Sequence, residues 1–350
     1  MAKRVTISDV AEKAGVSTGT VSAVINDKSS VRKETRKHVL STIDVLGYEP
    51  SRVAQDLGSG SSVEKTDTDT AGIVVKEIYN PFYSEVIKGA QDRIEDEGYR
   101  LFIGASKGEY EEEGDLLETF RDRQLEGAVI APVVHEHADL SHLFLLQRTN
   151  FPFVLLEAVQ GLVVDVVSID NEEAGRRAVA HLLKTGHERI VHFSGPSYTQ
   201  HTRDRIRGVR TAFSESNSYF SDDIVVEAGP RMQGGYEAAK AVFEKRKHGD
   251  IPTGVTCFND LVAIGVLRAL AEIGLSVPED VSVIGCDDIR PAEYLSTPLT
   301  TVRAPKYEMG KRAVEMLLRK IKTTADKQPD PQRVHLESEL VLRESTAPRT

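Results

Sequence analysis

The chain has 350 residues, of which 40% are hydrophobic, and this length is enough to bury the cores of two or three domains. Its formal net charge of -10 argues against a protein that binds nucleic acid over its whole surface. The charge is uneven, however, because residues 1–40 hold eight Lys and Arg against four Asp and Glu, or about +4. A basic N-terminus on an acidic body predicts that only this segment meets phosphate groups.

The two cysteines, Cys257 and Cys286, lie far apart in apolar runs, and no Cys-x-x-Cys pair occurs. We expect buried free thiols in a reducing compartment rather than a metal site or a catalytic thiol. No secretion signal opens the chain at residues 1–4, and no apolar run approaches the length of a membrane span. The expected location is therefore the cytoplasm, with no membrane partner.

Residues 5–46 read as three short helices. Thr6 can cap the first helix, and Gly15 follows its last residue, where a left-handed backbone ends a helix at low cost. Ser17 can cap a second helix that runs to Asn26. The inward positions of this second helix are Val21, Val24 and Ile25, and its exposed positions are Thr18, Gly19, Ser22 and Ala23. Two short helices joined by a tight turn predict a helix-turn-helix, with a small helical bundle that binds no ligand as the alternative.

A third helix is expected over residues 32–46, with an apolar face formed by Val39, Leu40, Ile43 and Leu46. Residues 51–57 follow as a short hinge helix. Residues 58–70 hold Gly, Ser, Thr and Asp with almost nothing apolar, which is typical of a flexible tether. The predicted domains are a helix-turn-helix head at residues 1–50, a hinge helix and linker at 51–70, and a body at 71–350.

From residue 71 onward, short apolar runs alternate with amphipathic helices, the pattern of parallel sheets covered by helices on both faces. In the first half the expected strands are 72–75, 101–105, 127–131 and 153–156, with helices at 81–97, 111–123 and 138–148. In the second half we expect strands 190–194, 224–226, 254–258 and 281–285, with helices at 172–185, 203–216, 234–247 and 260–273. A helix at 306–323 and one late strand at 334–342 are expected to cross back to the first half. The predicted fold class is α/β, with two parallel-sheet subdomains that form a bilobed body behind the head.

Several aromatic and polar residues fall just beyond predicted strand ends, where open parallel sheets bind their ligands. Phe82 and Tyr83 follow the first strand of the first half, and Asn259 and Asp287 follow two strands of the second half. Arg205 lies in the helix after another of those strands. An aromatic ring can stack on a sugar face, while the guanidinium, carboxylate and amide groups can exchange hydrogen bonds with hydroxyl groups. These five residues form the candidate ligand site.

Each of these residues also has a purely structural interpretation. Phe82 can be a core residue at the start of a helix. Arg205 and Asp287 can pair with each other across the two lobes without binding anything. Asp260, next to Asn259, can simply cap the helix that follows it.

Residues 5–57 resemble the DNA-binding head of the lac/gal repressor (LacI/GalR) family. The matching segments are Thr6-Ile7-Ser8-Asp9-Val10-Ala11, Ala14-Gly15-Val16-Ser17, Thr20-Val21-Ser22, Val24-Ile25-Asn26, Thr35-Arg36, Leu46-Gly47-Tyr48 and Arg52-Val53-Ala54-Gln55. The body is similar to the same family, which shares its fold with periplasmic sugar-binding proteins. Its landmarks are Asn80-Pro81-Phe82-Tyr83, Asp170-Asn171, Ser194-Gly195-Pro196, Phe258-Asn259-Asp260 and Gly285-Cys286-Asp287-Asp288.

The resemblance implies a transcription repressor that binds a near-palindromic operator in double-stranded DNA as a homodimer, under the control of a small-molecule effector. It assigns DNA contacts in the head and hinge to Thr6, Ser17, Thr18, Gly19, Thr20, Ser22, Ala23, Asn26, Arg52, Ala54 and Leu57. It assigns effector contacts to Phe82, Tyr83, Arg205, Asn259 and Asp287. We expect a sugar as the effector, with a nucleoside or a purine as the alternative.

Two other classes of protein compete with this interpretation. An enzyme is disfavoured because the chain has no nucleophile elbow, phosphate loop, metal-spaced His/Cys cluster or dinucleotide-binding glycine motif. For the same reason we expect no cofactor and no metal. A stand-alone solute-binding protein is disfavoured by the basic head and by the lack of a secretion signal.

Overall fold

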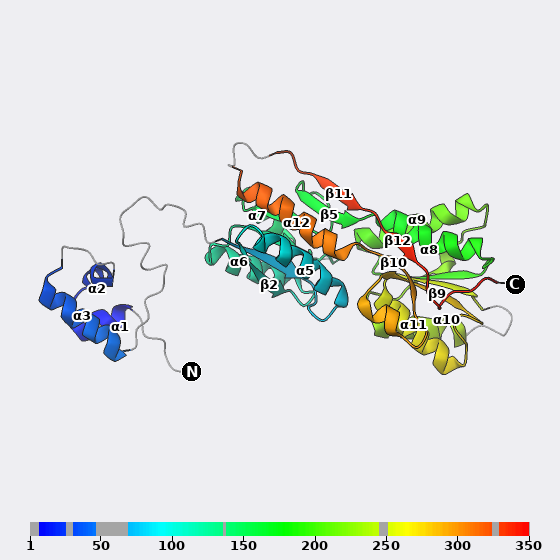
Figure 1. The fold of residues 1–350 in the computed structure, drawn as a ribbon, viewed down its shortest axis with the longest axis horizontal. Helices are drawn as coiled ribbons and strands as arrows, with labels where there is room; N and C mark the ends of the chain where they lie inside the picture. The colour runs from blue at the N-terminus through cyan, green and yellow to red at the C-terminus, as the bar shows by residue number, and fades with distance from the viewer. Residues whose placement is uncertain are drawn as a thin grey trace. The chain divides into compact units, whose positions relative to one another are not determined.

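The computed structural model describes residues 7–25, 31–46, 69–135, 138–244, 251–323 and 329–349. The chain divides into two compact units, Met1–Asp67 and Thr68–Thr350, both drawn in Figure 1. No helix among the described residues is long and apolar enough to cross a membrane. Several predicted features lie outside the described residues: the hinge helix, residues 58–68 of the tether, and the DNA contacts Thr6, Asn26, Arg52, Ala54 and Leu57.

The first unit contains the three helices that the sequence predicts, namely α1 (Ile7–Ala14), α2 (Thr18–Ile25) and α3 (Lys33–Leu46). Gly15 has a φ of 64°, the left-handed conformation expected after α1. The Thr20 amide donates to Ser17 Oγ at 3.2 Å, which confirms the predicted cap of α2. The small core between the three helices has at its centre Val10, Val21 and Val39, none of which is exposed.

The predicted burial of one residue of α3 is wrong. Val39 is fully buried, and Ile43 and Leu46 pack against the same core, but Leu40 is 46% exposed. Successive residues of a helix are turned by about 100°, so the rotation that buries Val39 carries Leu40 out of the apolar face. The buried face of α3 is therefore narrower than the sequence suggests.

The first lobe of the second unit is built on a six-stranded parallel sheet with the order β11-β5-β4-β3-β1-β2. Its strands are β1 (Thr70–Val75), β2 (Arg100–Ala105), β3 (Ala128–Ile130), β4 (Phe153–Leu155), β5 (Asp165–Ile169) and β11 (Arg333–Leu336). Its helices are α5 (Pro81–Glu95), α6 (Tyr110–Asp122), α7 (Ser141–Arg148) and α12 (Lys306–Ile321). Ile73 and Val75 of β1 pack with α5 and α12, whereas Val74 between them packs with α6 and α7. Because Thr70 opens β1, the tether ends earlier than predicted.

The second lobe has a six-stranded sheet with the order β12-β10-β9-β8-β6-β7, in which only β12 is antiparallel. Its strands are β6 (Ile190–Ser194), β7 (Val225–Glu227), β8 (Gly254–Cys257), β9 (Ser282–Asp287), β10 (Thr300–Arg303) and β12 (Glu339–Val341). Its α-helices are α8 (Asn171–Lys184), α9 (Gln200–Glu215), α10 (Met232–Glu244) and α11 (Asp260–Ile273). Phe193 packs on the side of α10 and α11, and Ile284 on the side of α8 and α9. Both lobes thus have the predicted two-sided helical cover.

The chain passes between the lobes three times, from β5 to α8, from β10 to α12, and from β11 to β12 (Figure 1). The expected return of the late segments is confirmed, since α12 packs on α5 and β11 pairs with β5. The single late strand predicted at 334–342 is wrong, because β11 and β12 belong to different sheets. Two strands of the structure, β5 and β10, are not predicted from the sequence. No helix separates β5 from β4, so the alternation of helix and strand does not reveal it.

Among the described residues, three helix pairs approach so closely that each helix places a glycine against the backbone of its partner. A Cβ on Gly89 of α5 or on Gly310 of α12 would lie 1.9 Å from a carbonyl oxygen of the other helix. The same arrangement joins α8 to α9 and α10 to α11, through Gly175 and Gly208 and through Gly235 and Gly265. No larger side chain fits at these positions unless the helix axes move apart.

Candidate effector site and head surface

A cavity of about 340 Å³ lies between the lobes of the second unit, at the carboxyl ends of the strands. All five residues of the predicted site line it: Phe82, Tyr83, Arg205, Asn259 and Asp287. Further lining residues that the sequence analysis does not assign to the site come from both lobes and include Lys76, Glu157, His201 and Phe258. The volume lies within the range of small-molecule sites.

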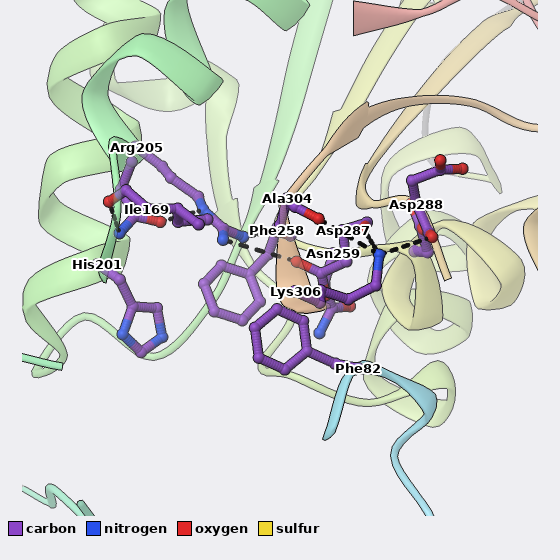
Figure 2. Close-up of polar contacts among 12 residues, drawn as sticks. Phe82, Ile169, His201, Arg205, Phe258, Asn259, Asp287, Asp288, Ala304 and Lys306 are labelled. Atoms are coloured by element: carbon purple, nitrogen blue, oxygen red, sulfur yellow. Dashed lines mark hydrogen bonds and ion pairs between the residues drawn. The ribbon is translucent and has the colours of Figure 1, made fainter. Parts of the chain in front are cut away.

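Arg205 of α9 is held in the cavity by contacts from several elements (Figure 2). Its Nε donates to Asn171 Oδ1 at 3.0 Å, and its Nη1 donates to the carbonyl oxygen of Phe258. The guanidinium carbon lies 4.8 Å from the centroid of the Phe258 ring, a cation–π contact. Its Nη2 lies 3.8 Å from Asp287 Oδ1, which is an ion pair but too long for a hydrogen bond. That edge of the guanidinium can therefore donate to a polar group bound beside it.

Asp287 ends β9 with a φ of 116° and is almost fully buried. This backbone conformation is unusual for a residue other than glycine and persists only where the surroundings over-determine it. Burial raises the pKa of the Asp287 carboxyl to about 6, although nearby Arg205 and Lys306 act to lower it. The carboxyl group therefore titrates near pH 6; it donates as an acid below this value and accepts as a carboxylate above it.

Replacing Asp287 by Asn is expected to stabilise the protein above pH 7. The folded pKa of about 6 lies above the ordinary value of 3.8, so the stability that the bound proton confers is lost as the pH rises through 6. A difference of about two pH units corresponds to about 3 kcal/mol, and the neutral amide avoids this loss. Thermal unfolding at about pH 4, near the ordinary pKa, and at about pH 8, above the folded pKa, measures the effect, with most of the gain at the higher pH. An equal rise in Tm at both pH values would contradict the destabilisation that we assign to the buried, ionised Asp287 carboxylate.

Asn259 and Asp260 have different structural roles from those suggested by the sequence. Asn259 caps α11, because the Val262 amide donates to its Oδ1 at 2.8 Å, and its Nδ2 donates to the Pro230 carbonyl at 3.0 Å. Asp260 is not the cap but a fully buried residue that accepts from the Thr301 hydroxyl at 2.5 Å. Asn259 therefore reaches the cavity with part of its hydrogen-bonding capacity already used.

Phe82 and Tyr83 start α5 at the wall of the cavity. Phe82 is partly buried and packs against the cores of both lobes, so the structural interpretation of this residue is right in part. Tyr83 is 9% exposed, and its ring meets Phe82 edge-on with centroids 5.3 Å apart. Burial raises the pKa of the Tyr83 hydroxyl to about 12, so the group stays protonated and available as a donor.

A charged group that the sequence does not predict spans the two lobes at the cavity wall. His201 Nδ1 of α9 lies 2.6 Å from Glu157 Oε1, and Lys76 Nζ lies 3.1 Å from Glu157 Oε2. Burial acts to raise the pKa of Glu157, but His201 and Lys76 hold it well below its ordinary value. Lys76 directly follows β1 and Glu157 closely follows β4, so the strand-end rule could have found both. Further contacts between the lobes include Arg231 with Glu77 and the Tyr198 hydroxyl with His135 Nδ1 at 3.4 Å.

The described surface of α2 carries small side chains. Thr18 and Gly19 are exposed, whereas Ala23 is partly buried. The hydroxyl groups of Ser17 and Thr20 lie 3.0 Å apart, so these two predicted DNA contacts pair with each other in the head. The side chain of Ser22 lies outside the described residues. No long polar side chain extends from the described predicted contacts of α2, which leaves them a short reach toward base edges.

Known protein families match both units of the chain. The pattern of "Bacterial regulatory proteins, lacI family" covers residues 6–51, and that of "Periplasmic binding protein-like domain" covers residues 179–346. Among solved structures, the transcriptional regulator CelR–cellobiose complex is 29% identical, with a TM-score of 0.71, over 98% of this chain and 100% of that one. The lac repressor dimer bound to operator and the anti-inducer ONPF is 26% identical, with a TM-score of 0.69, over 99% and 100%.

A curated relative matches almost the full length. The chain is 35% identical to the HTH-type transcriptional repressor PurR of Vibrio vulnificus (strain CMCP6), over 97% of its own length and 98% of the relative's. The chain therefore belongs to the LacI family of bacterial transcription regulators and is not an enzyme; it joins an N-terminal helix-turn-helix to a bilobed, periplasmic-binding-protein-like effector domain.

Proposed function

We propose that the protein is a repressor that binds a pseudo-palindromic operator as a homodimer and changes its affinity for DNA when a small molecule occupies the cavity between its lobes. The observation that carries this proposal is the meeting of Arg205, Asp287 and Phe82 in one interlobe cavity. Residues from both lobes line the cavity, so an occupant that contacts both favours one relative position of the lobes over others.

On the DNA side, we propose that α2 enters the major groove and that the hinge contacts Arg52, Ala54 and Leu57 lie in the minor groove. One head covers too few base pairs for useful specificity, whereas paired heads match a pseudo-palindrome. The similar lac repressor is a dimer on its operator, which supports this arrangement. Because α2 presents small side chains at Thr18 and Gly19, we expect much of the affinity to come from phosphate contacts and DNA bending.

For the effector, we propose a purine or a nucleoside. The PurR repressor of V. vulnificus matches this chain along nearly its whole length, which supports this class over the sugar expected from the sequence. The site chemistry supports it as well. The Asp287 carboxyl, with a pKa of about 6, accepts as a carboxylate and donates when protonated, and the amide-like edge of a purine presents both donors and acceptors. Arg205 adds donors, and Phe82 offers an apolar ring beside them.

A sugar is the second candidate, because the CelR–cellobiose complex is also similar over 98% of this chain. Its hydroxyl groups would use the same guanidinium and carboxyl groups, with an aromatic ring against the sugar face. Thermal shift with adenine, guanine, hypoxanthine, their nucleosides, ribose and cellobiose separates the two classes. A true effector at about 100 times its Kd adds about 2.7 kcal/mol, or roughly 5–10 °C in Tm. A shift with sugars alone would overturn the purine proposal.

The operator is identified by selection from a random DNA library, followed by fluorescence anisotropy with and without the effector. We expect a two-fold symmetric site, an affinity that falls steeply with salt, and a change in affinity when the effector is added. A monomer that binds a half-site as tightly as the full site would contradict the dimer. An operator affinity that no compound changes would contradict effector control.

A further inference from the structure

Lys306, the first residue of α12, carries an ammonium group in an almost fully buried position, with only 2% of the residue exposed. Its Nζ donates to the carbonyl oxygens of Asp287 at 2.5 Å and Asp288 at 2.9 Å (Figure 2). The carbonyl oxygen of Ala304 lies 3.5 Å away, and the Glu85 carboxylate lies 3.6 Å away. Burying a cation is costly unless its donors are satisfied, and here several oxygen atoms surround it.

The two carbonyl groups belong to an unusual backbone. Asp287 has a φ of 116° and Asp288 a φ of 54°, so two successive residues other than glycine adopt positive φ. Each such conformation is strained and needs fixed neighbours to persist. The ammonium group supplies a neighbour that both carbonyl oxygens approach at once. It therefore holds the segment that aims the Asp287 side chain into the cavity.

Lys306 also stands where the chain returns from the second lobe to the first. It follows the crossover from β10, and the helix that it opens packs on α5 through Gly89 and Gly310. Glu85, its ion-pair partner, lies in the first turns of α5, three residues after Phe82. One side chain thus touches the end of β9 in the second lobe and the start of α5 in the first.

We infer that Lys306 is a positioning residue of the cavity, which fixes the backbone of Asp287 and Asp288, and with it the Asp287 carboxyl group, to the start of α5. The inference rests on the proposed function only where it treats Asp287 as an effector contact. A ligand that displaces Asp287 then also displaces the Lys306 ammonium group and, through it, the start of α5. This coupling requires no contact between the ligand and α12.

The test compares Lys306→Met, which removes all donors, with Glu85→Gln, which keeps the carbonyl bonds and removes only the ion pair. The Asp287 carboxyl is followed by carbon NMR of the full-length protein labelled at the aspartate carboxyl carbon, with Asp287→Asn to assign its signal. The charged and titratable groups around this carboxyl are Arg205 from α9, Asp260 from α11, Lys306 from α12, Tyr83 from α5, and its neighbours Cys286 and Asp288. The wild-type midpoint is expected near pH 6.

Lys306→Met should move this midpoint upward, because a nearby positive charge is lost, while Glu85→Gln should leave it near the wild-type value. Hydrogen exchange supplies the second readout. Lys306→Met should speed exchange by about tenfold or more at residues 286–288 and at the start of α5, whereas Glu85→Gln should affect α5 alone. If Lys306→Met does not fold, Lys306→Gln serves instead: it also removes the charge and should raise the midpoint to a similar extent, but its amide donor should make the increase in exchange smaller.

Either of two results overturns the inference: a Lys306 variant with wild-type midpoint and wild-type exchange, or a Glu85→Gln midpoint that moves as far as that of Lys306→Met. Neither measurement uses an effector or DNA. A failure of the inference is therefore distinct from a failure of the proposed function, which the ligand panel and the operator assay test separately.

Discussion

The Arg205→Ala variant is expected to lose its response to the effector while it keeps its affinity for operator DNA. Removing the guanidinium leaves the buried Asp287 carboxyl without its ion-pair partner and removes the donors that Arg205 presents to the cavity. The loss of one partner from a buried charged pair costs about 2–5 kcal/mol, or roughly 30-fold to several thousand-fold in Kd. Calorimetry with the compound identified by thermal shift measures the affinity, and anisotropy on the selected operator measures DNA binding.

Arg207 offers a matched control on the same helix. Its side chain is 52% exposed and pairs with Glu172 and Asp204 at the surface, so Arg207→Ala should leave effector affinity within a factor of two or three. An Arg205→Ala variant that is folded and binds the effector as tightly as Arg207→Ala does would remove Arg205 from the site.

The Gly310→Ala variant is expected to lose about 3 kcal/mol of stability. The new Cβ would lie 1.9 Å from the carbonyl oxygen of Val86 and 2.9 Å from the amide nitrogen of Ala90, and backbone atoms cannot rotate away as a side chain can. The helices α5 and α12 must separate, which falls at the upper end of the usual cost of overpacking, about 1–3 kcal/mol. The expected fall in Tm is roughly 6–12 °C, measured by calorimetry.

Gly114→Ala is the corresponding control, because it makes the same chemical change inside helix α6. There a Cβ meets only His142, at 3.8 Å, an ordinary contact. Alanine is a better helix former than glycine, so this variant should gain about 0.5–1 kcal/mol. The two variants should therefore change the stability in opposite directions. A Gly310→Ala variant as stable as Gly114→Ala would mean that α5 and α12 are not packed as closely as the structure shows.

Much of the fold could be predicted because its signals are local. Ser17 and Gly15 mark the ends of helices by their own backbone chemistry, and each helix–strand repeat of the body is visible in apolar spacing. The misses depend on tertiary structure. Leu40 is apolar yet exposed because the small head has room for only one face of α3. The late residues 334–342 read as one strand because nothing local shows that β11 and β12 join different sheets.

The candidate site divides in the same way. The strand-end rule brings Arg205 and Asp287 into one cavity because all parallel strands of a sheet end at the same edge. It does not reveal that His201 pairs with Glu157, since that contact depends on how the two lobes meet. Nor does it reveal Lys306, because a lysine at the start of a helix is ordinarily solvated, and its burial follows from the crossover.

The three crossovers also bear on how the protein is made. A ribosome that has completed β1 to β5 has not yet synthesised α12, which covers one face of that sheet, or β11, which pairs with its edge. The second lobe likewise lacks some of its hydrogen bonds until Ser345 is synthesised. The Oγ of this residue accepts from the Thr300 amide at 2.8 Å and donates to the Val283 carbonyl at 2.6 Å. Domains usually fold in the order of their synthesis. Here both lobes become complete within a few residues of each other, so the nascent first lobe keeps the α12 side of its sheet only partly covered until Lys306–Ile321 is made, and chaperones can bind the apolar surface that α12 later covers.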